Sequence, residues 1–118
     1  MTSPTDRDFW FLPLGGCGEI GMNLNLFGHD HHWLMVDCGI TFNADLNPTR
    51  VELPDPKFAM DLSDSLTGIV LTHAHEDHIG ALPYLYERLG SPTLYATPFT
   101  AGVIREKFRY ISVEPDLV

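Results

Sequence analysis

Hydrophobic and polar positions alternate along the N-terminal part of the chain. Met22 to Phe27 alternates with a period of two, which predicts a half-buried strand. Trp33 to Val36 is more continuously apolar and predicts a deeper strand, and an earlier strand is expected over Asp8 to Leu14. Residues 28–32 would form the turn between two antiparallel strands. The pattern therefore predicts antiparallel hairpins at the start of the fold.

The pattern of hydrophobic positions changes after residue 38. Residues 39–65 contain several prolines and predict a long loop with a short helix near residues 57–62. Ile69 to Leu71 reads as a short buried strand. The next apolar positions recur at helical spacing, and Gly90 and Pro92 predict where this helix stops. These apolar positions are Ile79, Leu82, Leu85, Tyr86 and Leu89.

A strand over residues 93–96 and a helix that Pro98 opens complete the expected elements. Hairpins followed by strand–helix units predict an α/β fold with a sheet of mixed direction. Residues 1–8 are polar, and we expect a disordered N-terminus there. Residues 9–118 show no linker or repeat, so we treat them as one domain or a portion of one.

Four metal-ligand side chains lie within six residues at the junction of a predicted strand and a predicted helix. They are His73, His75, Asp77 and His78, in the pattern HxHxDH. With this composition, a chance match is on the order of one in a thousand. Imidazole nitrogen and carboxylate oxygen are ligands that suit zinc and similar metals. The motif therefore predicts a metal site.

The spacing suggests how these ligands divide. Residues two apart in an extended segment point to the same side, so His73 and His75 could hold one ion together. Asp77 and His78 fall at the turn into the helix and must point elsewhere, which suggests a second, adjacent ion. The alternative is a solvated polar loop in which Asp77 only caps the helix.

The stretch Thr72-His73-Ala74-His75-Glu76-Asp77-His78 resembles the metal signature of the metallo-β-lactamase superfamily. Residues 11–23, with their glycine-rich loop, resemble the N-terminal strand and loop of the ribonuclease J branch, and residues 95–100 also fit that branch. Residues 33–37 resemble the strand that carries the superfamily's upstream aspartate. The resemblance runs from about residue 9 to residue 109.

This resemblance implies a fold and an activity. The fold would be the N-terminal part of an αββα sandwich, with a mixed sheet and helices on one face. The reaction would be phosphodiester hydrolysis of RNA by exonuclease and endonuclease action, with RNA as partner and two zinc ions as cofactors. His73 and His75 would hold one zinc, while Asp77 and His78 would hold the second. Asp37 would brace the motif loop by orienting a ligand histidine, and we expect a homo-oligomer for the full-length protein.

The family's pattern includes parts that these residues lack. It completes its site with a further histidine, a bridging aspartate and a last histidine, all downstream, and it carries an inserted substrate-binding domain. Two catalytic zincs need about six protein ligands, and the motif supplies four. We therefore expect the isolated chain to bind metal weakly and to be inactive or nearly so.

Composition and charge limit the partners and the cellular location that we expect for this protein. The net charge of −9 works against general affinity for RNA, although bound divalent metals would attract a phosphate locally. Arg105, Lys107 and Arg109 form the single basic cluster, which we interpret as a solvated helix face. No apolar stretch is long enough to cross a bilayer and no secretory signal is evident. Cys17 and Cys38 fit no short zinc spacing, so a cytoplasmic protein with reduced cysteines is expected.

Two further patterns suggest other sites. Residues 16–21 match the GxGxxG spacing of dinucleotide-binding loops, but that mechanism needs a helix next, and an alternating strand is expected instead. His29, Asp30, His31 and His32 could bind metal, yet an exposed hairpin turn is the preferred interpretation.

Two other functions compete with the ribonuclease. One keeps the fold and changes the substrate, as in a thioester hydrolase. The other is a non-catalytic metal-binding or interaction fragment.

Overall fold

A computed structural model describes residues 4–15, 21, 23–42, 51–52 and 57–118. The elements are β1 (Trp10–Gly15), β2 (Leu24–His29), β3 (His32–Val36), β4 (Thr41–Phe42), β5 (Val51–Glu52), α1 (Lys57–Asp61), η1 (Ser63–Ser65), β6 (Leu66–Val70), α2 (Glu76–Ile79), α3 (Leu82–Leu85), η2 (Glu87–Leu89), β7 (Leu94–Tyr95) and α4 (Pro98–Arg109).

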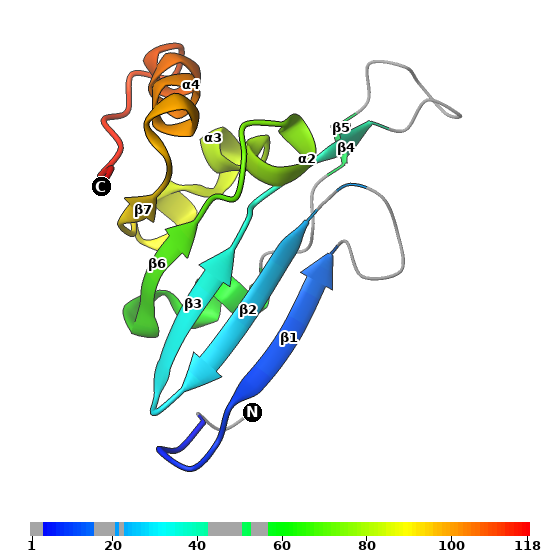
Figure 1. Ribbon diagram of the computed structural model, residues 1–118, viewed down its shortest axis with the longest axis vertical. Helices are drawn as coiled ribbons and strands as arrows, with labels where there is room; N and C mark the ends of the chain where they lie inside the picture. The colour runs from blue at the N-terminus through cyan, green and yellow to red at the C-terminus, as the bar shows by residue number, and fades with distance from the viewer. Residues whose placement is uncertain (1–3, 16–20, 22, 43–50, 53–56) are drawn as a thin grey trace.

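Five of the strands form one mixed sheet in the order β1-β2-β3-β6-β7 (Figure 1). β1, β2 and β3 pair antiparallel, as the alternating pattern predicted, and β3, β6 and β7 pair parallel. The turn between β2 and β3 has two residues with positive φ, Asp30 and His31, which is the geometry of a type I′ hairpin. β4 and β5 form a separate two-stranded ladder.

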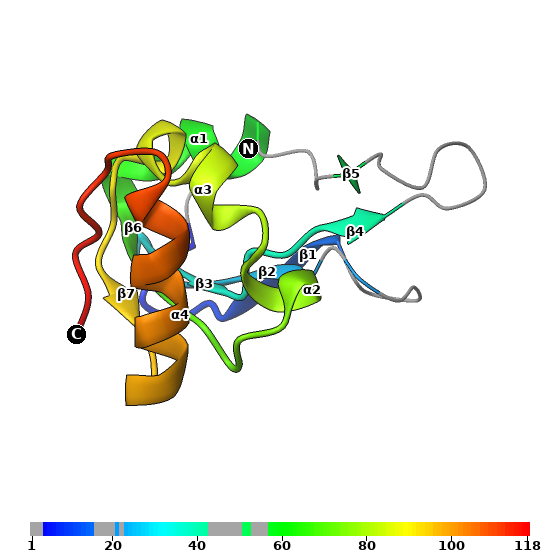
Figure 2. The ribbon, with the colours of Figure 1, turned by 90° about the horizontal axis from the view of Figure 1, so that it is seen from above.

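The two faces of the sheet differ in what covers them. Side chains from β2, β3 and β6 on one face are buried against helix residues, and Figure 2 shows α1 and α3 on the same side of the sheet. This core includes Leu24, Leu26, Trp33, Met35, Ile69, Ile79, Leu82, Leu85, Ile104 and Phe108. On the other face, Phe9 and Phe11 stay 70% and 51% exposed. The mixed sheet with helices on one face is therefore confirmed.

The helix predicted from residue 79 to residue 89 is broken into α2, α3 and η2. Pro83 has no N–H to donate to the carbonyl four residues earlier, so a continuous helix cannot form there. The N–H of Ala81 donates to the Cys38 carbonyl at 2.9 Å instead of to Asp77. The apolar positions are still buried as predicted, because the short turns keep them on one side.

The terminal segments also make defined contacts. Pro4 and Thr5 accept hydrogen bonds from the β2–β3 turn, and residues 1–3 lie outside the described part. The disorder expected over residues 1–8 stays a prediction. At the other end, Leu117 forms a parallel bridge with Leu94. No helix in the described part of the chain is long and apolar enough to cross a membrane.

The chain leaves β3 and runs directly beside α2. The N–H of Cys38 donates to the His78 carbonyl at 2.7 Å, and the N–H of Ile40 donates to the Glu76 carbonyl at 3.0 Å. Between them, a Cβ on Gly39 would lie 1.8 Å from the Asp77 carbonyl oxygen. Only glycine therefore allows this close approach of two backbones.

Gly39→Ala should destabilise the fold by roughly 3 kcal/mol, the upper part of the range for overpacking, because the atoms that it meets are backbone. It should also displace the Asp77–His78 segment. Thermal unfolding measures the loss. Gly102→Ala in α4 is the control: its Cβ meets nothing within 4 Å, and it should raise stability by up to about 1 kcal/mol. Equal melting temperatures for the two variants would contradict this packing.

Candidate metal centre

The candidate ligands lie where β6 ends and α2 begins. Residues 71–75 form an irregular link, and His75 occupies the N-cap position of α2. Asp77 lies in the first turn of α2, so the N-cap position that the alternative interpretation gave to Asp77 belongs to His75, whose side chain makes no capping hydrogen bond.

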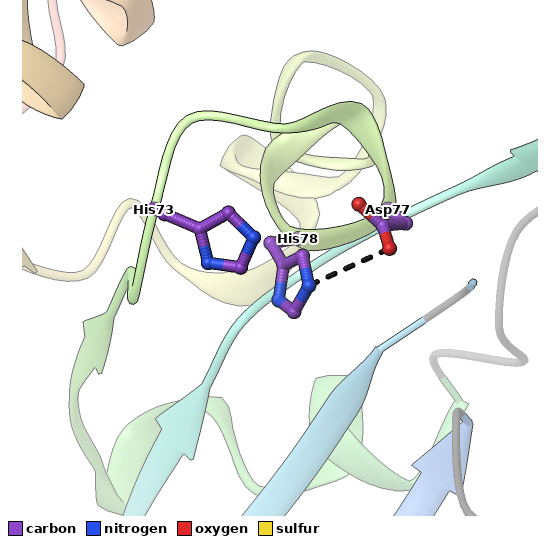
Figure 3. A group of neighbouring side chains, drawn as sticks. All are labelled: His73, Asp77 and His78. Carbon is purple, nitrogen blue, oxygen red and sulfur yellow. Dashed lines mark ion pairs between the residues drawn. The ribbon is translucent and has the colours of Figure 1, made fainter. Parts of the chain in front are cut away.

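Three potential ligand atoms come together in the described part of the chain. They belong to His73, Asp77 and His78 and lie within 4.8 Å of one another (Figure 3). The ring centroids of His73 and His78 are 3.8 Å apart, and the Nε2 of His78 lies 3.5 Å from Asp77 Oδ2. Tetrahedral ligands of zinc are roughly 3.3 Å apart, given bond lengths near 2.0 Å. Small side-chain rotations would therefore bring the three onto one ion.

His75 lies beside this group without joining it. Its ring meets the His73 ring edge-on at 4.8 Å between centroids, and its side chain is exposed. The trio thus takes one residue from the first predicted ligand pair and both from the second. The division of the four ligands between two ions stays a prediction.

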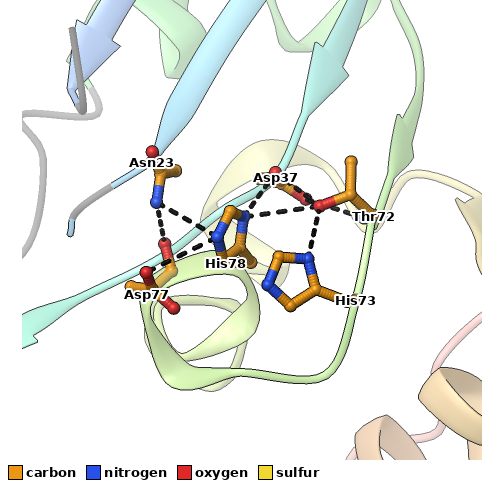
Figure 4. A network of polar contacts seen from close by, with 6 residues as sticks. All are labelled: Asn23, Asp37, Thr72, His73, Asp77 and His78. Carbon is orange, nitrogen blue, oxygen red and sulfur yellow. Dashed lines mark hydrogen bonds and ion pairs between the residues drawn. The ribbon is translucent and has the colours of Figure 1, made fainter. Parts of the chain in front are cut away.

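Asp37 forms hydrogen bonds with His78 and with Thr72, the residue before the motif. Its carboxylate is 5% exposed. Oδ2 lies 2.7 Å from His78 Nδ1, while the N–H of Thr72 donates to Oδ1 at 2.8 Å (Figure 4). A carboxylate can only accept here, so His78 Nδ1 carries the proton and Nε2 is left free for a metal. The bracing role predicted for Asp37 would use this hydrogen bond, and the role itself stays a prediction.

The backbone of Asp37 is itself unusual. Its φ is +65°, a left-handed conformation that costs a non-glycine residue roughly 1–2 kcal/mol. The N–H of Asp37 donates to the Val70 carbonyl at 2.8 Å, which anchors the residue at the ends of β3 and β6. Strained positions of this kind persist when surrounding contacts determine them, and here those contacts are with the candidate metal loop.

Two residues near the group were not assigned a role from sequence. The Thr72 hydroxyl lies 2.9 Å from both Asp37 carboxylate oxygens and 3.1 Å from His73 Nδ1. The Asn23 amide donates to the Asp77 carbonyl at 2.8 Å. Thr72 stands directly before the motif, whereas Asn23 ends the glycine-rich segment of residues 11–23 and is brought in from 54 residues away.

The other sequence patterns lie away from this group. His29 and His32 flank the hairpin turn, and their Nδ1 atoms lie 2.7 and 2.6 Å from the carbonyls of Asp8 and Asp30. The GxGxxG loop falls largely outside the described residues, but strand β2 follows it, so the helix that a dinucleotide site requires is absent.

The basic cluster of α4 is not simply solvated. Lys107 forms an ion pair with Glu76 of the metal motif, and Arg109 pairs with Glu106 at 3.1 Å. The interpretation as a solvated face was therefore wrong for Lys107, because the tertiary fold brings its side chain to Glu76.

Cys38 is fully buried next to Asp37. Burial and the neighbouring Asp37 charge raise the pKa of the Cys38 thiol to about 12. In a Cys17→Ser background, Cys38 should react with a thiol reagent at pH 8 at least ~1000-fold more slowly in the native protein than in denaturant, since three pKa units separate the two states.

The raised pKa of the Cys38 thiol makes the free energy of unfolding depend on pH. The folded state disfavours the thiolate, so this contribution to stability is complete below pH ~9 and is lost as the pH rises towards 12. Denaturant titrations at several pH values would measure it, with Cys38→Ala as the control that removes it. Rapid labelling of the native thiol would refute the burial.

The sequence comparisons agree with the fold. A family model described as "Beta-lactamase superfamily domain" matches residues 32–118. The chain is 49% identical over 107 residues to ribonuclease J of Sinorhizobium meliloti, which covers 86% of the chain and 19% of that protein. It is 40% identical over 106 residues to ribonuclease J of Mycolicibacterium smegmatis, covering 89% of the chain and 19% of that protein. The chain thus spans about a fifth of the length of these relatives.

Solved structures share the same arrangement. The chain matches human tRNase Z, short form, with a TM-score of 0.54 and 17% identity, over 92% of the chain and 42% of that structure. It matches the DIM-1 metallo-β-lactamase with a TM-score of 0.54 and 19% identity, over 97% of the chain and 47% of that structure. At such identities the likeness concerns the fold alone. With the family model covering most of the chain, the protein belongs to the β-lactamase superfamily and has the metallo-β-lactamase fold.

Proposed function

We propose that this chain is the N-terminal portion of a zinc-dependent ribonuclease of the ribonuclease J type. The observation that carries the proposal is the group of His73, Asp77 and His78, with His78 oriented by a buried carboxylate. The curated relatives at 40% and 49% identity are named ribonuclease J, which favours RNA as the substrate class.

The donor set fits a divalent metal. Two imidazoles and one carboxylate are ligands of zinc, and the hydrogen bond from His78 Nδ1 to Asp37 orients the ring so that Nε2 would face the metal. We propose that His73 and His75 hold one ion and that Asp77 and His78 hold a second. Bound zinc supplies the Lewis acidity that polarises a phosphate and the pKa shift that provides hydroxide near neutral pH.

The residues of this chain would do the positioning. Asp37 and Thr72 hold the His73 and His78 rings from the strand side, and α2 presents Asp77 on the other side of His78. A rigid donor set of this kind keeps the reacting phosphate in one geometry, which is worth several kcal/mol of the barrier. We also propose RNA as partner, a cytoplasmic location and a homo-oligomer for the complete protein.

The metal site can be tested by zinc titration calorimetry. His78→Ala should reduce the zinc affinity at least ~10-fold, because it removes both a ligand and its oriented ring. His75→Ala should remove one of the two ions that we propose. His31→Ala, in the hairpin turn, is the matched histidine control and should leave the affinity unchanged. Equal losses from His31→Ala and His78→Ala would move the site elsewhere.

The activity can be tested in the complete gene product. Chelation should abolish hydrolysis of single-stranded RNA and added zinc should restore it, while a thioester substrate should not turn over. Asp77→Ala should lower kcat/KM for RNA by at least ~100-fold, the scale for losing a group that acts on the transition state. Thioester turnover without RNA turnover would favour the other hydrolase, and neither activity would favour a metal-binding fragment.

A further inference from the structure

We propose that Asn23 is a positioning residue that holds the Asp77–His78 peptide in place for the metal. The inference rests on the metal site proposed above. It concerns a residue that is distant in sequence from the motif and lies just before β2.

Asn23 donates two hydrogen bonds to the same carbonyl oxygen. Its backbone N–H donates to the Asp77 carbonyl at 3.1 Å, and its side-chain Nδ2 donates to the same oxygen at 2.8 Å (Figure 4). Its own carbonyl accepts from the N–H of Gly39 at 2.9 Å. Since a carbonyl oxygen can only accept, the amide must present its nitrogen, so the orientation of the Asn23 side chain is determined.

This contact takes the place of a helical hydrogen bond at the Asp77 carbonyl. In a continuing α-helix the Asp77 carbonyl would accept from the N–H of Ala81. That N–H donates to Cys38 instead, and Asn23 takes its place at the Asp77 carbonyl. A carbonyl that is partly shielded from water needs a partner, and here the partner is Asn23, just before β2. The two ligand residues therefore lie in a short turn that is tied to the β-sheet.

The same amide lies close to the ligand nitrogen. Asn23 Nδ2 is 3.5 Å from His78 Nε2, the nitrogen left free when Nδ1 donates to Asp37. His78 is thus held from two sides, with Asp37 fixing its ring and Asn23 fixing its backbone. Groups that orient ligands in this way typically contribute 10–100-fold to metal affinity.

The decisive variant is Asn23→Leu, which keeps a similar shape and removes both side-chain polar groups. Asn25→Leu is the matched control: Asn25 lies two residues further along, in β2, and its Oδ1 has no hydrogen-bond partner among the described residues. The first readout, in the complete gene product, is the affinity for cobalt(II) from its visible absorption. Asn23→Leu should bind about 10–100-fold more weakly, and Asn25→Leu should bind like the wild type.

The second readout needs no metal. The N–H of Cys38 donates to the His78 carbonyl, one peptide unit beyond the one that Asn23 contacts, so its hydrogen exchange reports on how firmly this turn is held against the segment after β3. In metal-free protein, Asn23→Leu should accelerate that exchange at least ~10-fold, with no such change in the control. If Asn23→Leu does not fold, Asn23→Ser, which retains one donor, replaces it and should show smaller effects in the same direction.

The outcomes distinguish the proposed role of Asn23 from the proposed metal site. Wild-type affinity and wild-type exchange in Asn23→Leu would overturn the role of Asn23, even with the metal site intact. Absence of cobalt binding by the wild type would overturn the metal site, and the exchange experiment would still decide whether Asn23 holds the peptide. Equal losses in Asn23→Leu and Asn25→Leu would reduce the effect to general destabilisation and also overturn the proposal.

Discussion

The buried carboxylate of Asp37 is the interaction on which the candidate site depends. It accepts hydrogen bonds from Thr72 at the end of β6 and from His78 in α2, so one group joins two consecutive parts of the motif. A buried charge is costly unless it is hydrogen-bonded, and these donors supply the bonds. The left-handed backbone of Asp37 adds strain that the same contacts must offset. The strained backbone of Asp37 therefore lowers the stability of the fold, while its carboxylate holds the His78 ring in one orientation.

Parallel pairing explains why this carboxylate can reach both partners. β3 and β6 are neighbours that run in the same direction, so their carboxyl ends open at the same edge of the sheet. Asp37 follows β3 and Thr72 follows β6, and both therefore stand at that edge. Sites in α/β folds commonly form at the carboxyl ends of strands for this reason. α2 then returns against the segment after β3, where Gly39 permits contact between backbones.

The sheet face that the helices do not cover carries exposed aromatic side chains. Phe9 and Phe11 pack against Phe27, with ring centroids 6.0 and 5.1 Å apart, and the first two remain largely exposed. The matched solved structures extend well beyond the part that this chain covers, since it spans 42% and 47% of two of them. In the four-layer sandwich that the family resemblance implies, an apolar face of this kind would pack against a second sheet.

The sequence by itself determined the local features, because these depend on neighbours in the chain. Period-two alternation placed β2, a more continuously apolar run placed β3, and the apolar patterns that flank HxHxDH placed the candidate ligand residues at a strand–helix junction. The broken helix after His75 was missed, although Pro83 was visible, because the partner of the Asp77 carbonyl is Asn23. Only the tertiary structure decided that contact, the pairing of Lys107 with Glu76, and the grouping of His73 with Asp77 and His78. Contacts between residues far apart in the chain depend on strand order and on the close approach of backbones, and no local spacing encodes them.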